Sequence, residues 1–187
     1  MRIGARRTLA VADATAKSPK RILAALRLGE NPRVDGFEIG QSIGFLNKVG
    51  GRVRKRYYDL VLRVNEGRIF CEVKRWTRWP PGPDALKSAE SQLRRDVVKA
   101  LTALEQNAEE LTDLRRLRWI MPGGEDGLAG KKAAIVAHFK EAIDTPSVRQ
   151  ALARSLRERG RRVTKSAIQE LVEQAKNSLD EVITFVE

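Results

Sequence analysis

Cysteine and histidine are almost absent from this sequence: each occurs once among 187 residues, as Cys71 and His138. A single cysteine cannot form an intrachain disulfide, and Cys71 lies within an apolar run, as expected of a small core residue in a reducing compartment. His138 lies in a helical stretch far along the chain, where we expect a position on the helix surface or at the edge of the core. A catalytic thiol activated by histidine is therefore not expected.

Long hydrophobic runs are absent as well. No segment approaches the roughly 18 apolar residues of a membrane-spanning helix, and the basic N-terminal sequence lacks the continuous apolar stretch of a signal peptide. The sequence has no repeat and no low-complexity linker, and 42% of its residues are apolar, an ordinary share for a globular protein. We therefore expect no signal peptide and no membrane span. We expect one domain over residues 1–187, with a core at about 36–120 and a helical C-terminal part at about 129–187.

Acidic residues are in deficit. The chain carries 36 lysine and arginine residues against 24 aspartate and glutamate residues, which gives a formal net charge of +12 at pH 7. Such a charge favours polyanionic partners, for example nucleic acid, an acidic protein or an anionic membrane. Charge alone does not choose among these partners.

Four apolar runs have the length and composition of β-strands. Residues 57–64 and 69–76 predict a hairpin, in which Gly67 supplies the turn. The run LRWIMP, residues 117–122, is short and ends at a proline, so it predicts a third strand. The run EVITFV, residues 181–186, has strand propensity and is expected to pair at a sheet edge.

Helices are predicted where apolar residues recur three or four positions apart. The helix over 84–114 has a regular apolar face, whereas the one over 36–49 rests on an imperfect stripe that two glycines weaken. Ser166 and Gln169 have the spacing of a capping box at the start of the last helix. Strands and helices together indicate an α/β fold. The predicted helices span residues 18–28, 36–49, 84–114, 129–143, 146–159 and 166–179.

Three charged residues lie within the predicted hairpin, where buried strands are normally uncharged: Asp59 in the first strand, and Glu72 and Lys74 in the second. An uncompensated carboxylate in such a place costs several kcal/mol, so it is kept neutral, paired with a cation or bound to a metal. Because side chains alternate along a strand, Glu72 and Lys74 share one face, while Cys71 and Val73 point to the other. Asp59 can approach Glu72 across the strand pair.

Two carboxylates and an ammonium group at one place suit a hard divalent cation. Oxygen ligands hold Mg²⁺, the metal lowers the pKa of bound water, and lysine can steady the attacking hydroxide or the developing charge on a phosphoryl group. The alternative is a cross-strand salt bridge at a sheet end, in which Lys74 pairs with Asp59 or Glu72. We favour the metal site, because a purely structural pair would not need both acids.

The arrangement D-x₁₂-E-x-K on a predicted hairpin, with an acid upstream and a helix downstream, resembles the PD-(D/E)xK nuclease superfamily. The resemblance covers roughly residues 36–120, and CEVK is the only E-x-K in the chain. The sequence departs from the motif because Tyr58, not proline, precedes Asp59. Two acids lie upstream, Glu30 and Glu38, of which the second falls in a predicted helix. The resemblance implies a restriction-endonuclease-like core, in which a central mixed β-sheet is flanked by helices.

The same resemblance implies roles for individual residues. Asp59 and Glu72 would be the metal ligands, and Lys74 would be the catalytic lysine. Glu38 would be the acid contributed by the first core helix, and Gln92 would complete the site from the helix after the hairpin. The implied cofactor is Mg²⁺, with Mn²⁺ or Zn²⁺ as alternatives.

Basic and aromatic residues surround the motif. The segment GGRVRKR, residues 50–56, is interpreted as a loop that tracks phosphates, with a merely solvated loop as the alternative. Trp76 and Trp79 flank Arg78, where exposed indoles could stack on bases, but we favour indoles folded over the core edge. Residues 157–162, RERGRR, are either a second phosphate contact or a solvated helix end, and we favour the latter. The candidate nucleic-acid-binding residues are Arg52, Arg54, Lys55, Arg56, Arg75, Trp76 and Arg78.

These observations predict a divalent-metal-dependent endonuclease. DNA is favoured over tRNA as substrate, because the metal site is suited to attack by water and needs no 2′-hydroxyl. Small basic domains of this fold also resemble the C-terminal toxin domains of bacterial polymorphic toxins, including those of contact-dependent growth inhibition. That resemblance implies an acidic immunity protein as partner and action in the cytoplasm of a target bacterium. The alternative is a non-catalytic nucleic-acid-binding module, although its acids would then oppose the phosphates they approach.

Overall fold

The structure is a computed structural model that describes most of the chain from Val34 onwards. It describes residues 34–39, 42–49, 52–64, 67–74, 76–103, 111, 113–123 and 128–186, with only the backbone described for the first three strands and for Val186. The helix predicted over 18–28 and the upstream acid Glu30 lie outside the described residues.

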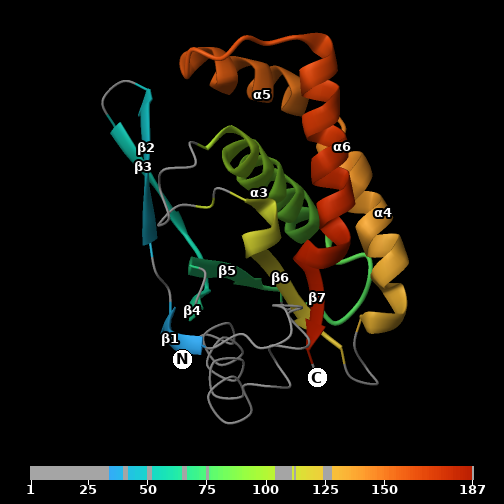
Figure 1. The fold of residues 1–187 in the computed structure, drawn as a ribbon. Coiled ribbons are helices and arrows are strands. Elements are labelled where there is room, and N and C mark those ends of the chain that lie inside the picture. The colour runs from blue at the N-terminus through green and yellow to red at the C-terminus, as the bar shows by residue number, and fades with distance from the viewer. Residues whose placement is uncertain are drawn as a thin grey trace.

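A mixed sheet of five strands forms the centre of the described chain (Figure 1). Its strands are β1 (Val34–Ile39), β4 (Leu60–Val64), β5 (Gly67–Val73), β6 (Leu117–Pro122) and β7 (Ile183–Val186). In the spatial order β1-β4-β5-β6-β7, the first two pairings are antiparallel and the last two are parallel. The predicted hairpin, the third strand and the C-terminal edge strand are therefore confirmed, and the chain is of the α/β class.

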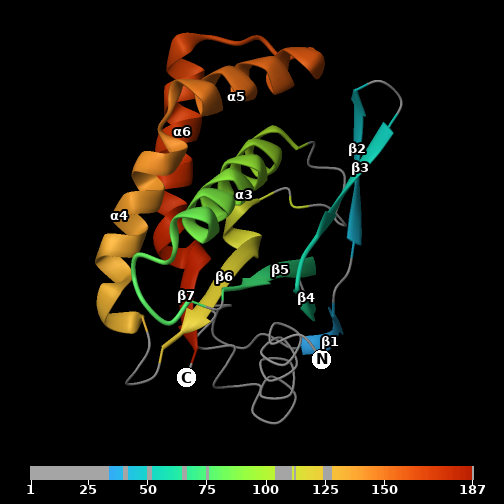
Figure 2. The ribbon, with the colours of Figure 1, turned by 180° about the vertical axis from the view of Figure 1, so that it is seen from behind.

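The helix predicted over 36–49 is wrong. The segment contains β1 and the strand β2 (Ser42–Val49), which pairs with β3 (Arg52–Tyr57) in a separate two-stranded sheet. Two glycines weaken the helical stripe, each by roughly 0.5–1 kcal/mol, and pairing with β4 gives the β1 backbone its hydrogen bonds instead. Figures 1 and 2 show the β2–β3 hairpin standing away from the larger sheet.

Glycine is required at the β4–β5 turn. Gly67 has φ of 127°, a conformation that side chains rarely tolerate. A Cβ atom at this position would also lie 2.6 Å from a guanidinium nitrogen of Arg116. The expectation that Gly67 supplies the turn is confirmed.

The described helices alternate with the last two strands in sequence. Three of them, α3, α4 and α6, pack on one face of the sheet, and α5 packs against α3 and α6 (Figures 1 and 2). None of them is both long and apolar enough to cross a membrane. The predicted capping box is wrong, because Thr164 is the N-cap of the last helix and accepts a hydrogen bond from the backbone N–H of Ala167. The helices are α3 (Pro83–Thr102), α4 (Lys132–Ile143), α5 (Pro146–Glu158) and α6 (Lys165–Val182), with short 3₁₀ turns at Leu114–Arg116 and Ala129–Lys131.

The helix predicted over 84–114 is too long. Its first part is α3, but the backbone of Ala103 is extended, with φ −61° and ψ 152°, which ends the helix. Leu111 of the predicted apolar face, and Leu114 at the predicted end of the helix, are nevertheless buried in the same core as Leu93 and Val97 of α3. The pattern of apolar residues therefore identified core positions correctly beyond the end of the helix.

Successive side chains along each central strand point alternately into two apolar layers, one on each face of the sheet. Val61, Phe70 and Trp119 face α3, α4 and α6 and belong to the main core. Cys71 and Ile120 face the other side, in a cluster completed by Leu60, Leu62 and Ile69. Glu72 follows the parity of Phe70, so its side chain lies on the helical side of the sheet.

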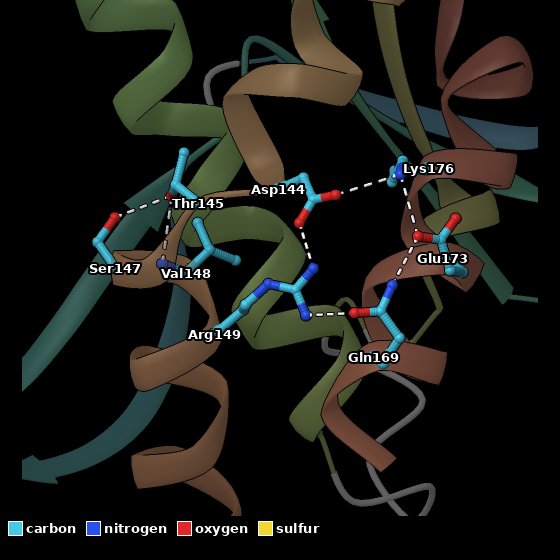
Figure 3. Close-up of polar contacts among 8 residues, drawn as sticks. All are labelled: Asp144, Thr145, Ser147, Val148, Arg149, Gln169, Glu173 and Lys176. Carbon is cyan, nitrogen blue, oxygen red and sulfur yellow. Dashed lines mark hydrogen bonds and ion pairs between the residues drawn. The ribbon is translucent and has the colours of Figure 1, made fainter. Parts of the chain in front are cut away.

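A small polar network joins α4, α5 and α6 (Figure 3). Asp144, just after α4, accepts hydrogen bonds from Arg149 of α5 and, at 3.2 Å, from Lys176 of α6. Arg149 also donates to Gln169 Oε1 at 2.6 Å, and Lys176 Nζ lies 3.0 Å from Glu173 Oε1. This network and the apolar contacts beneath it hold α5 against α6.

Candidate active site

Asp59, Glu72, Lys74 and Gln92 come together where the β4–β5 hairpin meets α3. Asp59 directly precedes β4, whose first residue, Leu60, pairs with Cys71. Asp59 therefore stands beside Glu72 in the backbone register. Lys74 directly follows β5, and its backbone N–H donates to the carbonyl of Ile120 at 2.8 Å, which continues the ladder to β6. The backbone on both sides of the site is thus fixed by the sheet.

Gln92 bridges Glu72, near the end of β5, and Lys74, which directly follows that strand. Its amide nitrogen donates to Glu72 Oε1 at 2.6 Å, and its Oε1 accepts from Lys74 Nζ at 2.5 Å. Lys74 Nζ lies farther from Glu72 itself, 3.9 Å from Oε2. The side chains of Lys74 and Glu72 are only 11% and 8% exposed, so this group of charges is largely removed from solvent.

Asp59 makes a different kind of contact. Its Oδ2 accepts a hydrogen bond of 2.9 Å from the backbone N–H of Val73, and its side chain is half-buried. Among the residues that the structure describes, Asp59 makes no ion pair with Lys74. The cross-strand pair of Lys74 with Asp59, one form of the structural alternative, is therefore not what holds this carboxylate.

The donor set fits a hard cation. Asp59, directly before β4, and Glu72, on β5, supply two carboxylates, and a carboxylate has about four lone-pair sites. Mg²⁺ commonly takes one or two carboxylates and completes its shell with water and substrate phosphate. Within the described ranges, no group of three or more His, Cys, Asp or Glu side chains converges. Mg²⁺ or Mn²⁺ matches these oxygen donors better than Zn²⁺, which takes imidazole and thiolate ligands readily.

The helical position expected for Glu38 is wrong. Glu38 lies in β1, where its Cα pairs with that of Val61 in β4. Val61 is two residues from Asp59, so the backbone of Glu38 runs close to the level of the site. Its side chain lies outside the described part of the structure, so its proposed role as a third acid stays a prediction.

The expectation that the basic segment upstream of the site is a loop is wrong. Arg52, Arg54, Lys55 and Arg56 lie in β3, which ends at Tyr57, two residues before Asp59. Of these residues the structure describes only the backbone. The pairing with β2 explains the extended conformation, because the register joins Arg54 to Phe45 and Arg56 to Ile43.

The aromatic residues after the hairpin pack at the edge of the core. Trp76 is 9% exposed and its ring stacks on Phe139 with centroids 6.3 Å apart, which favours the core-edge interpretation over stacking on a base. Trp79 is half-buried against Trp76 and against His138, whose ring centroid is 5.5 Å away. Arg78 is exposed, whereas Arg75 lies outside the described residues.

His138 occupies the core-edge position expected of it. Its Nε2 lies 2.9 Å from Glu90 Oε1 on α3, and the ring is half-buried. Cys71 is fully buried, and that burial raises the pKa of its thiol to about 12. A thiol with so high a pKa is not a nucleophile at neutral pH, which agrees with the expected core role.

Two features of the site were missed from the sequence. The Tyr58 hydroxyl donates to Asp96 Oδ1 at 3.4 Å, and both residues are buried. Asp96 lies one helical turn after Gln92, so a search for polar residues on the inner face of α3 would have found it. Trp119 lies under Lys74, with Nζ 4.0 Å from the ring centroid. No local pattern signals that contact, because it depends on the pairing of β5 with β6.

Comparison with known proteins adds no assignment. No family model, no curated protein and no solved structure matches this chain.

Proposed function

We propose that this chain is a divalent-metal-dependent endonuclease, of the restriction-endonuclease-like class. The observation that carries the proposal is the chain of contacts Glu72–Gln92–Lys74 beside Asp59. Two acids and one ammonium, brought together by a hairpin and a helix, form a set of groups suited to metal-assisted hydrolysis of a phosphodiester.

The residues divide the work between binding and charge stabilisation. Asp59 and Glu72 would hold the cation. Mg²⁺ or Mn²⁺, when bound, would lower the pKa of water and neutralise phosphate charge. Lys74 would stabilise the negative charge that develops as the phosphate is attacked, and Gln92 would hold the Lys74 ammonium at a fixed place. The low exposure of Glu72 and Lys74 strengthens these electrostatic effects.

An architectural salt bridge accounts for fewer of the contacts. The Glu72–Lys74 separation of 3.9 Å is near the limit of an ion pair, and the shorter contacts of both residues go to Gln92. A buried ion pair held for stability alone is often no better than apolar residues of the same size. A nucleic-acid-binding module, the second alternative, would benefit from the net charge of +12 but leaves the acids of the site without a purpose.

The biological setting is part of the proposal. DNA is the favoured substrate over tRNA, because attack by water needs no 2′-hydroxyl. The resemblance to toxin domains of polymorphic toxins supports a delivered effector that acts in the cytoplasm of a target bacterium. An acidic immunity protein would then be the natural partner of this basic chain.

The test is cleavage of plasmid DNA and of total tRNA by the purified protein with Mg²⁺ or Mn²⁺, beside an EDTA control. We expect cleavage that depends strictly on the metal and is abolished in Asp59→Ala and Glu72→Ala, because each removes one of the two proposed metal ligands. Asp180→Ala is the matched control, since Asp180 is an acid on α6 that pairs with Lys140 at 3.1 Å. Binding without cleavage would favour the non-catalytic module, and near-normal activity of either variant would refute the metal site.

A further inference from the structure

The Lys74 ammonium rests on an aromatic ring. Its Nζ lies 4.0 Å from the centroid of Trp119, within the distance at which a cation is attracted to the face of an indole. Trp119 lies in β6, directly opposite Glu72 in the parallel register with β5. The ring is fully buried, so it cannot turn away from Lys74 without disturbing the core.

The indole N–H of Trp119 destabilises the folded protein, and the packing of the ring does not require it. Trp119 Nε1 is buried and has no hydrogen-bond partner among the described residues, and an unsatisfied buried donor is destabilising. Phenylalanine would supply an aromatic side chain for the edge contact with Phe139, 5.2 Å between centroids, without that donor. What tryptophan adds is a larger and more electron-rich face, and the face is the part that Lys74 contacts.

We propose that Trp119 is a positioning residue for Lys74, and this inference rests on the proposed nuclease function. Three groups from three elements confine the ammonium. Gln92 on α3 accepts its hydrogen bond, Glu72 on β5 attracts it at 3.9 Å, and Trp119 on β6 supports it through the ring face. An ammonium held in this way needs little reorganisation when negative charge develops on the substrate.

The test is a double-mutant cycle on single-turnover cleavage, with Trp119→Phe, Lys74→Met and the double variant at saturating Mg²⁺. We expect Trp119→Phe to lower the turnover by about 3–30-fold with little change in KM, because one cation–π contact is lost or weakened. In the Lys74→Met background the same substitution should change turnover less than about 2-fold, because the cation it supports is gone. Trp119→Tyr, which keeps an aromatic face, should retain more activity than Trp119→Leu.

Controls separate positioning from packing. Met121→Ala removes a buried side chain two residues along the same strand and should lower the melting temperature while leaving turnover within about 2-fold. Equal loss from Trp119→Phe in both backgrounds, or a change in KM alone, would overturn the inference while leaving the nuclease intact. No metal-dependent cleavage by the wild-type protein would instead overturn the proposed function, and the inference with it. If Trp119→Leu fails to fold, the phenylalanine and tyrosine variants still decide the matter.

Discussion

A single amide joins the two charged side chains of the candidate active site. Gln92 donates to Glu72 and accepts from Lys74 at the same time. Of the neutral side chains of this length, only glutamine offers a donor and an acceptor on a planar amide. Gln92 therefore orients both charged groups without changing the net charge of the site.

Gln92→Leu should slow cleavage without abolishing it. Loss of an outer hydrogen-bonding partner of a metal site typically lowers activity by roughly 10–100-fold, and leucine has nearly the same volume as glutamine. The check is the single-turnover rate at saturating Mg²⁺. The matched control is Gln174→Leu, which replaces an exposed glutamine on α6 and should keep the wild-type rate. A wild-type rate in Gln92→Leu would mean that the bridge has no part in the reaction.

Residues of the site differ in how far local sequence could identify them. Alternation along a strand predicts the shared face of Glu72 and Lys74, and the turn at Gly67 predicts that Asp59 returns beside them. The structure places all three as expected. Trp119 and Asp96 could not be found in this way, because their contacts depend on which strand pairs with β5 and on how α3 rotates over the sheet.

The strand β3 leads directly into the candidate site and carries four basic residues over six positions. If nucleic acid follows this strand, each phosphate contact adds close to one unit to the slope of log K against log salt.

Replacing Arg52, Arg54 and Arg56 together by glutamine should therefore reduce the magnitude of that slope by up to about 3. The measurement is fluorescence anisotropy of labelled DNA over a salt series in EDTA, which prevents cleavage. The control replaces three exposed arginines at the end of α5 by glutamine, namely Arg157, Arg159 and Arg162. This variant has the same change in charge and should leave the slope nearly unchanged. An unchanged slope in the β3 variant would remove this strand from the interface.

The α4–α5–α6 network has a pH dependence of definite sign (Figure 3). Hydrogen bonding from Arg149, with a smaller contribution from Lys176, holds the pKa of Asp144 below its ordinary value of 3.8. A lowered pKa stabilises the folded state above pH 3.8, and this stabilisation is lost as pH falls through the folded pKa. The pKa of Lys176 is raised from 10.5, mainly by Glu173, so its contribution is lost only at strongly alkaline pH.

Asp144→Asn should consequently lower stability by about 1 kcal/mol or less at neutral pH, since the network is partly exposed. Melting temperatures of wild type and variant should converge as pH is lowered from 7 towards 2. Asp180→Asn removes an acid that pairs with Lys140 alone among the described residues, and it should show a smaller difference. A gap between Asp144→Asn and wild type that persists at pH 2 would contradict the assigned cause.

Elements were predictable where one signal dominated. The hairpin, β6 and β7 have apolar runs bounded by turn residues, and α5 and α6 have regular apolar faces, so local pattern sufficed. The segment 36–49 carried competing signals. Its aromatic and branched residues suit a strand, and a period of three or four suits a helix weakly; pairing with β4 and β3 decides the outcome.

At the scale of the whole molecule, the sheet and α3 have a common role. The antiparallel β4–β5 pair brings Asp59 beside Glu72, and the parallel β5–β6 pair places Trp119 under Lys74. The helix α3 places Gln92 between the charged groups of Glu72 and Lys74. Polar groups at the ends of β4 and β5 and on α3, with an aromatic ring from β6, thus converge where the sheet meets the helical layer. Such convergence of largely buried charges is typical of functional sites and is costly to maintain for stability alone.

The central claim is that these charges act on a phosphodiester. Its most direct test is the single-turnover cleavage rate of Lys74→Met at saturating Mg²⁺, with melting temperature and substrate affinity measured on the same protein. If Lys74 stabilises the transition state, turnover should fall by roughly 10²–10⁴-fold while affinity and stability change little, since bound metal still neutralises the acids. A wild-type rate, together with a loss of about 3–5 kcal/mol of stability, would show that the charges are architectural and would contradict the nuclease assignment.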